Sequence, residues 1–117
     1  MVNPLNKFLC LLAMVPLAAD AGQVVSLSEE MVKPFIKKSC IRCHGPEKQK
    51  GKLRLDELPL KMSNDSIAAH WQDVLDTLNA GDMPPEEEEQ PTKKELTGFL
   101  AELTGKLKDA RRQLSDQ

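Results

Sequence analysis

Cys40-Ile41-Arg42-Cys43-His44 is the most informative segment of this chain. Its Cys-x-x-Cys-His order is the attachment pattern of c-type haem. Two thiols at this spacing can each form a thioether with one vinyl group of the same porphyrin, and the adjacent imidazole is then delivered to the iron. We therefore expect covalently bound haem c, with His44 as one axial ligand of its iron.

Three other uses of Cys40 and Cys43 compete with haem attachment. A thioredoxin-like redox pair places Cys-x-x-Cys at the start of a helix that follows a strand, and no strand pattern precedes Cys40. A structural zinc site needs four ligands, and only His44 and the distant His70 are available to join the two thiols. A disulfide across two intervening residues is strained and rarely structural. The pattern favours haem attachment over all three.

Met83 is the predicted second axial ligand. It lies in Gly-Asp-Met-Pro-Pro, residues 81–85, which cannot continue a helix because each proline lacks the amide hydrogen that the helix requires. A thioether held on such a stiff loop suits an iron that changes oxidation state, and Met/His ligation raises its reduction potential. Met31, Met62, His70 or an open iron position are the alternatives.

Three amphipathic helices are predicted around these segments, at about residues 27–39, 65–79 and 93–113, from apolar side chains that recur at helical spacing. Residues 44–56 are punctuated by glycine and proline and predict a loop with a short extended piece. No convincing strand pair or internal repeat is present, so we expect an all-α fold. The helix starts carry capping signals, namely Ser26 with Glu29, Asn64 or Asp65, and Thr92 with Glu95.

The predicted walls of the haem pocket are aliphatic and aromatic side chains: Leu53, Leu55, Leu58, Ile67, Trp71 and Leu75. The indole N–H of Trp71 can donate to a haem propionate, although packing in the core is the commoner fate of such a residue. The backbone carbonyl of Pro59 or Gly45 is a candidate acceptor for the second ring proton of His44, a contact that fixes the plane of a ligating imidazole.

Residues 1–21 have the pattern of a secretory signal, with Lys7 before an apolar run and a small-x-small cleavage site ending at Ala21. The run is shorter than the roughly 20 apolar residues that span a bilayer. We therefore expect export to the periplasm or another extracytoplasmic compartment, no stable membrane span after cleavage, and a mature domain at 22–117. Cys10 is removed with the signal, which leaves Cys40 and Cys43.

The 117-residue length fits one domain, and the net charge of −2 with interspersed basic residues gives no support to nucleic-acid binding. Basic side chains are nevertheless frequent around the attachment motif. We expect them to steer an acidic redox protein toward the haem edge. They are Lys37, Lys38, Arg42, Lys48, Lys50, Lys52 and Arg54, whereas the glutamates at 86–89 are predicted to form a solvated loop.

The chain resembles the class I cytochrome c fold, and more closely the planctomycete-type cytochrome c domain. The resemblance covers roughly residues 28–105 and is carried by the Cys-x-x-Cys-His-Gly segment at 40–45, Lys-Gly-Lys-Leu-Arg-Leu-Asp at 50–56, Trp71 with Val74, and Gly-Asp-Met-Pro-Pro at 81–85. It implies one covalent haem c, His44 and Met83 as iron ligands, and crossed N- and C-terminal helices.

The expected function is electron transfer outside the cytoplasm by a mono-haem carrier that is not itself an enzyme. The rival class is a haem enzyme module or gas sensor with an open sixth position on the iron. Because domains of this family often occur in much longer proteins, an electron-entry domain shortened from a larger protein is a further alternative.

Overall fold

The computed structural model describes residues 22–117, and the predicted signal segment lies outside them. Three α-helices occur in this part of the chain: α1 (Glu29–Ser39), α2 (Asp65–Ala80) and α3 (Lys93–Ser115). A 3-10 turn, η1 (Lys50–Lys52), lies between α1 and α2. The all-α class I cytochrome c-like prediction is confirmed, with helix bounds within two residues of those expected.

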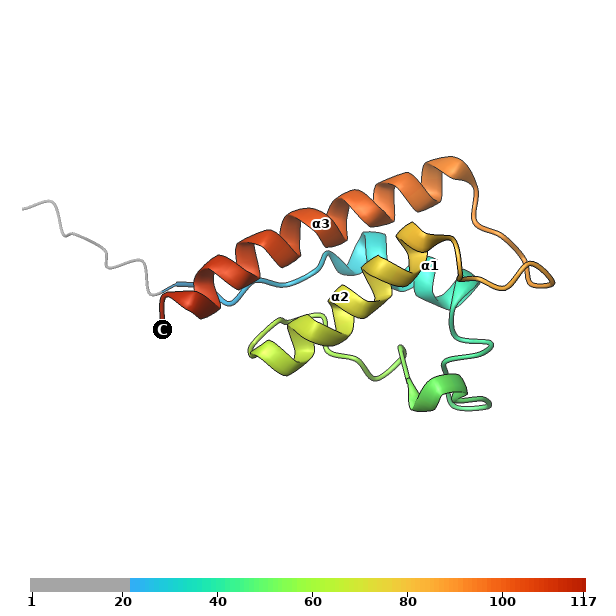
Figure 1. The fold of residues 1–117 in the computed structure, drawn as a ribbon, viewed down its shortest axis with the longest axis horizontal. Coiled ribbons are helices and arrows are strands. Elements are labelled where there is room, and N and C mark those ends of the chain that lie inside the picture. The colour runs from blue at the N-terminus through green and yellow to red at the C-terminus, as the bar shows by residue number, and fades with distance from the viewer. Residues whose placement is uncertain (1–21) are drawn as a thin grey trace, which may run out of the picture.

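The longest helix, α3, packs against both α1 and α2, which lie along one of its sides (Figure 1). The residues that precede α1 follow the C-terminal half of α3. Gln113 fixes them there, because its side-chain oxygen accepts from the Val25 amide at 3.2 Å and its nitrogen donates to the Gln23 carbonyl at 2.9 Å.

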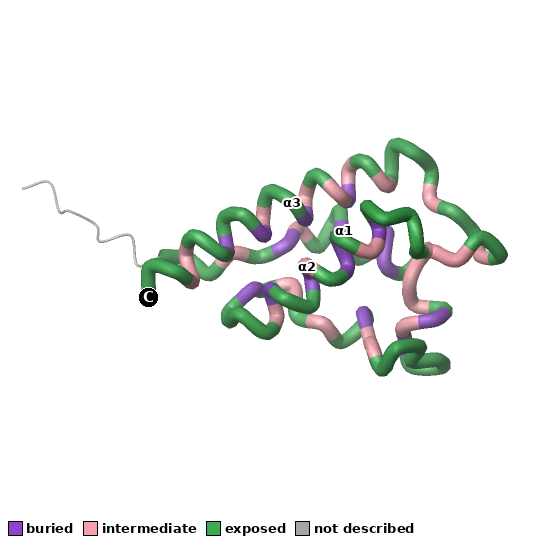
Figure 2. The backbone as a smooth tube through the Cα atoms, viewed as in Figure 1, coloured by how far each residue is buried: buried purple, intermediate pink, exposed green. Residues whose placement is uncertain are grey.

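The core lies between α3 and the other two helices, and buried positions face inward on each of them (Figure 2). Phe35 of α1 and Phe99 of α3 stack with ring centroids 4.0 Å apart and an interplanar angle of 10°. The largest fully buried side chains are Trp71, Phe99, Met62, Leu103 and Val32. Met62 therefore belongs to the core, whereas Met31 is 47% exposed.

Local signals set most helix ends. The Asn64 side chain accepts from the Ile67 amide at 3.0 Å and caps α2, whose C-terminal end is Gly81 in the left-handed conformation at φ 76°. Thr92 and Glu95 form the predicted capping box at the start of α3.

One prediction for the first half of the chain is wrong. The N-cap of α1 is Ser28 and not Ser26, and the Ser28 amide donates to the distant Glu102 carboxylate at 2.8 Å. The loop predicted at 44–56 contains the 3-10 turn η1, in which Gly51 has φ 65°, and Leu53 after it is extended, with φ −104° and ψ 128°. Pro34 lies inside α1, which continues through it.

Candidate haem-binding site

The attachment segment folds into one tight turn directly after α1. The Cys40 amide continues the helical pattern by donating to the Ile36 carbonyl at 2.9 Å. The Cys40 carbonyl then accepts from the amides of Cys43 and His44, at 3.2 and 3.0 Å. The sequence folds this way because the carbonyls at the end of α1 need amide donors, and the next residues supply them. Both thiols and the imidazole are thereby presented from a single turn.

The following loop is hydrogen bonded to this turn at two points. The Lys50 amide donates to the Cys43 carbonyl at 2.9 Å, and the Leu55 amide donates to the His44 carbonyl at 2.8 Å. The loop also needs Gly45, because a Cβ atom there would lie 2.5 Å from the Ile41 carbonyl oxygen. These contacts hold Leu53 and Leu55 beside the attachment turn.

One cleft of about 240 Å³ gathers the predicted iron and haem ligands. Cys40, Cys43 and His44 line it from the attachment turn, and Met83 lines it from the loop after α2. Of the predicted pocket walls, Leu53 and Leu55 contribute, and Leu55 is only 6% exposed. The remaining lining comes from the end of α1, the attachment turn, α2 and the loop after α2: Lys38, Ser39, Arg42, Asp73, Val74, Thr77, Leu78, Pro84, Pro85, Glu88 and Glu89.

Trp71 is not among the residues that line this cleft. Its side chain is fully buried in the core, and its indole Nε1 donates to the Pro59 carbonyl at 2.8 Å. The acceptor of this N–H is therefore the Pro59 carbonyl, and not a haem propionate as considered from the sequence. His44 Nδ1 has no hydrogen-bond partner among residues 22–117, so neither the Pro59 nor the Gly45 carbonyl accepts from it.

Leu58, Ile67 and Leu75, also expected as walls, do not line the cleft. The α2 side chains that do so include Val74 and Leu78. Both belong to the apolar face of α2 that helical spacing identified, but periodicity alone does not separate the part of that face that meets α3 from the part that borders the cleft.

The alternative iron ligands lie elsewhere. Met62 is fully buried in the core, and Met31 is exposed on α1. His70 is exposed on α2, where its Nδ1 lies 2.7 Å from the Ser66 carbonyl. Met83 is thus the one candidate of the four that lines the cleft with His44. Met83 is 38% exposed, so the cleft is open to solvent at this residue.

Charged groups at the rim are paired across the cleft. Arg42 lies 3.0 Å from Glu88, and Lys38 lies 3.0 Å from Glu95 and 3.9 Å from Glu89. The run of glutamates is therefore not simply solvated, since Glu88 is only 23% exposed. Arg54, another member of the expected basic ring, pairs with its own neighbours in the loop.

The residues at the cleft fit a covalently attached haem. Two unpaired thiols, an imidazole and a thioether form a donor set of the kind that holds haem iron, and the walls between them are largely apolar. His44 Nδ1 is buried without a hydrogen-bond partner, the one such side-chain atom among residues 22–117. A buried polar atom without a hydrogen bond lowers the stability of the fold, so it marks a place where the described protein groups do not supply every partner.

Burial raises the pKa of the Cys40 thiol to about 12. Nucleophilic cysteines of redox pairs have the opposite perturbation, since their thiolates are stabilised at neutral pH. No group of three or more His, Cys, Asp or Glu side chains within 22–117 is arranged to hold a metal ion. No helix in the same range has the length and apolar character needed to cross a bilayer.

Comparison with known proteins agrees with this geometry. Residues 40–87 match the family model described as planctomycete cytochrome C. The match begins at the first cysteine of the attachment turn and includes η1, α2 and the Met83 segment. No match was found among curated proteins or among solved structures.

Proposed function

This chain contains a planctomycete-type cytochrome c domain, and from that premise we propose that it is an exported mono-haem electron carrier. Cytochrome c domains bear covalent haem c and are typically electron carriers rather than enzymes. In the proposed assignment, Cys40 and Cys43 would form the thioethers, and His44 and Met83 would bind the iron. One observation carries the proposal: a single cleft is lined by all four side chains.

The bound haem supplies reversible one-electron chemistry at its iron. The chain's own residues fix its environment. Cys40 and Cys43 prevent loss of the group, and His44 is oriented by the turn in which its amide and carbonyl are both hydrogen bonded. Leu53, Leu55 and the α2 side chains keep water from much of the cleft, and a less hydrated site with a thioether ligand favours the reduced state.

The redox partner is proposed to be an acidic protein. Three of the seven basic residues expected to face it are engaged in ion pairs, which leaves Lys37, Lys48, Lys50 and Lys52 as the candidates. Replacing Lys48 and Lys50 by glutamate should slow reduction by an acidic donor at low ionic strength, and the difference should fade as salt is added. Unchanged kinetics at low salt would remove this docking surface from the proposal.

The decisive experiment is to produce the full chain with a haem-maturation system in the bacterial periplasm. We expect a mature mass equal to the processed polypeptide plus one haem, and absorption spectra of a low-spin c-type cytochrome in both oxidation states. A protein with the bare polypeptide mass would contradict haem attachment. N-terminal sequencing of the same sample tests cleavage before Gly22.

Ligation by Met83 is tested with Met83→Ala and a matched control, Met31→Ala, which removes an exposed methionine that does not line the cleft. The oxidised wild-type protein and the control should show the weak far-red band of a sulfur–iron bond, and Met83→Ala should lack it. Ready carbon monoxide binding by the wild-type protein, with no far-red band, would instead support a haem enzyme or gas sensor with an open sixth position.

A further inference from the structure

The loop that carries Met83, defined here as the Met83 loop (residues 82–92), is closed on itself by one side chain. The Gln90 amide nitrogen lies 2.8 Å from the Pro85 carbonyl and 3.2 Å from the carbonyls of Pro84 and Glu88. The Glu88 amide also donates to the Pro85 carbonyl at 2.9 Å. These bonds join the residues directly after Met83 to those near the end of the loop.

Both ends of the Met83 loop are attached to helices. At its start, the Asp82 amide donates to the Thr77 carbonyl at 3.2 Å, within the C-terminal cap of α2. At its end, Thr92 and Glu95 form the capping box of α3, with bonds of 2.8 and 3.2 Å. The helices therefore fix where the loop begins and ends, but these bonds do not hold its middle against the attachment turn.

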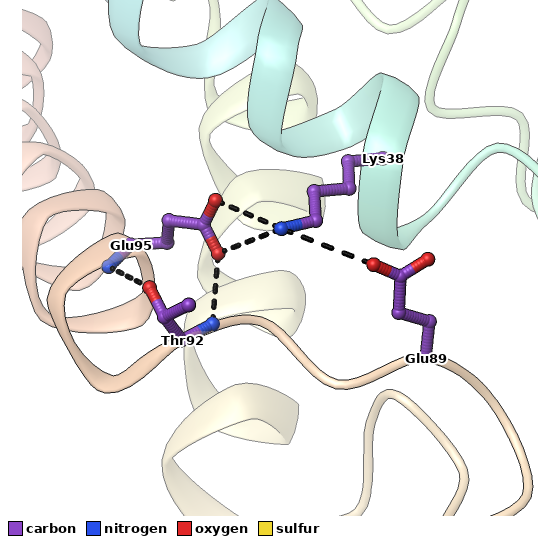
Figure 3. Close-up of polar contacts among 4 residues, drawn as sticks. All are labelled: Lys38, Glu89, Thr92 and Glu95. Carbon is purple, nitrogen blue, oxygen red and sulfur yellow. Dashed lines mark hydrogen bonds and ion pairs between the residues drawn. The ribbon is translucent and has the colours of Figure 1, made fainter.

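Ion pairs supply that missing connection. Lys38, at the end of α1, is placed between the Glu95 carboxylate of α3, at 3.0 and 3.1 Å, and the Glu89 carboxylate of the Met83 loop, at 3.9 Å (Figure 3). Arg42, between the two cysteines, lies 3.0 Å from Glu88. The same short segment that would hold the haem on one side is thus joined to the loop that presents the opposite ligand.

We infer that Lys38 and Arg42 are positioning residues that hold the Met83 loop over the cleft, and so keep the Met83 thioether at the iron. The inference rests on the proposed His44 and Met83 ligation. It assigns these two basic side chains to the cytochrome's own structure and not to a docking surface. Met83 is 38% exposed and lines the cleft from this loop, so the position of its thioether follows that of the loop.

The expected effect is moderate, because these ion pairs lie at the surface. An exposed ion pair changes an equilibrium constant by about one- to fivefold, so losing the contacts of both basic residues should raise Met83 displacement roughly three- to tenfold. Salt screens such pairs, and wild-type Met83 should therefore be displaced more easily at high ionic strength.

The test is a titration of the oxidised holoprotein with imidazole, which competes with Met83 for the iron. Binding is measured as the loss of the far-red band. The double variant Lys38→Gln, Arg42→Gln is compared with a matched double variant, Lys37→Gln, Lys48→Gln. The control removes the same charge from side chains that form no ion pair within residues 22–117. A third variant, Lys38→Arg, retains the charge and serves as the rescue.

We expect the first double variant to bind imidazole about three- to tenfold more tightly than wild type at low salt, with the difference lost at high salt. The control and Lys38→Arg should bind as wild type does, and the thermal midpoints of all variants should remain similar. Equal affinity of the first variant and wild type, or an equal shift in the control, would overturn the inference. A wild-type protein that lacks the far-red band and binds imidazole as an open site would overturn the Met83 ligation on which it rests.

Discussion

The substitution Trp71→Phe separates two roles that this indole can have in a haem protein. In one, its N–H binds the cofactor, and replacement alters the absorption spectrum and the reduction potential. In the other, it joins α2 to the segment before it, and replacement alters stability. Trp71 is fully buried, lies outside the cleft lining, and donates to the Pro59 carbonyl at 2.8 Å, so we predict the second result.

The magnitude follows from the contacts that are lost. Removing the indole N–H breaks its bond to the carbonyl of Pro59, an exposed residue, and the loss of such a bond costs about 0.5–1.5 kcal/mol in the free energy of unfolding. Phenylalanine is also smaller than tryptophan, and the unfilled space adds about 1 kcal/mol or more. The sum, about 2 kcal/mol, is a measurable part of the roughly 5–15 kcal/mol that stabilises a domain.

The assay is urea unfolding of the holoprotein followed by circular dichroism, together with a redox titration of each variant. Phe35→Leu is the comparison, because it removes aromatic volume from the core without removing a hydrogen-bond donor. Trp71→Phe should lose stability while its potential stays close to that of wild type. A variant of near wild-type stability whose potential shifts clearly would refute the reasoning and return the indole to the cofactor.

Three further predictions follow from single contacts. Phe99→Ala removes a 2% exposed ring that stacks on α1, and should lower the free energy of unfolding by about 3–5 kcal/mol in urea melts. The Thr92 amide, with help from Lys38, holds the pKa of Glu95 below its ordinary value. The ionised Glu95 carboxylate should therefore stabilise the fold fully at neutral pH, and this stabilisation should disappear as pH falls below about 4.5. Thermal melts of Glu95→Gln should accordingly show a lower midpoint at neutral pH and no difference in strong acid. Gly45→Ala should reduce the yield of haem-loaded protein, measured by absorbance, because its Cβ would collide with the backbone of the attachment turn.

Features that depend on neighbouring residues were predictable from the sequence. The caps at Asn64 and at Thr92 with Glu95 form as expected, because each side chain reaches an amide only three residues away. The same reasoning failed at Ser26, where the amide of the actual N-cap, Ser28, binds Glu102 from α3. A partner so distant in sequence cannot be read from local spacing.

In the candidate site, too, local features were predictable from the sequence and tertiary ones were not. The spacing of Cys40, Cys43 and His44 is local, and the structure places the three in one turn beside Met83. The tertiary surroundings were less predictable, because they depend on how α2 is rotated against α3. This rotation takes Trp71 into the core and turns Val74 toward the cleft. The ion pair between Arg42 and Glu88 could not be predicted either, because it joins two segments that are distant in the sequence.

The helix that contributes nothing to the cleft lining also determines the shape of the cleft. α3 packs against α1, whose last turn leads into Cys40, and against α2, whose apolar residues form part of the cleft wall. The stacked rings of Phe35 and Phe99 join α1 to α3. Because α3 contacts both other helices, it fixes the position of the attachment turn relative to α2. Because the side chains around a new cavity shift to fill part of it, Phe99→Ala should displace the attachment turn relative to the α2 wall of the cleft. The far-red band of Phe99→Ala should then weaken even though the substituted side chain lies outside the cleft.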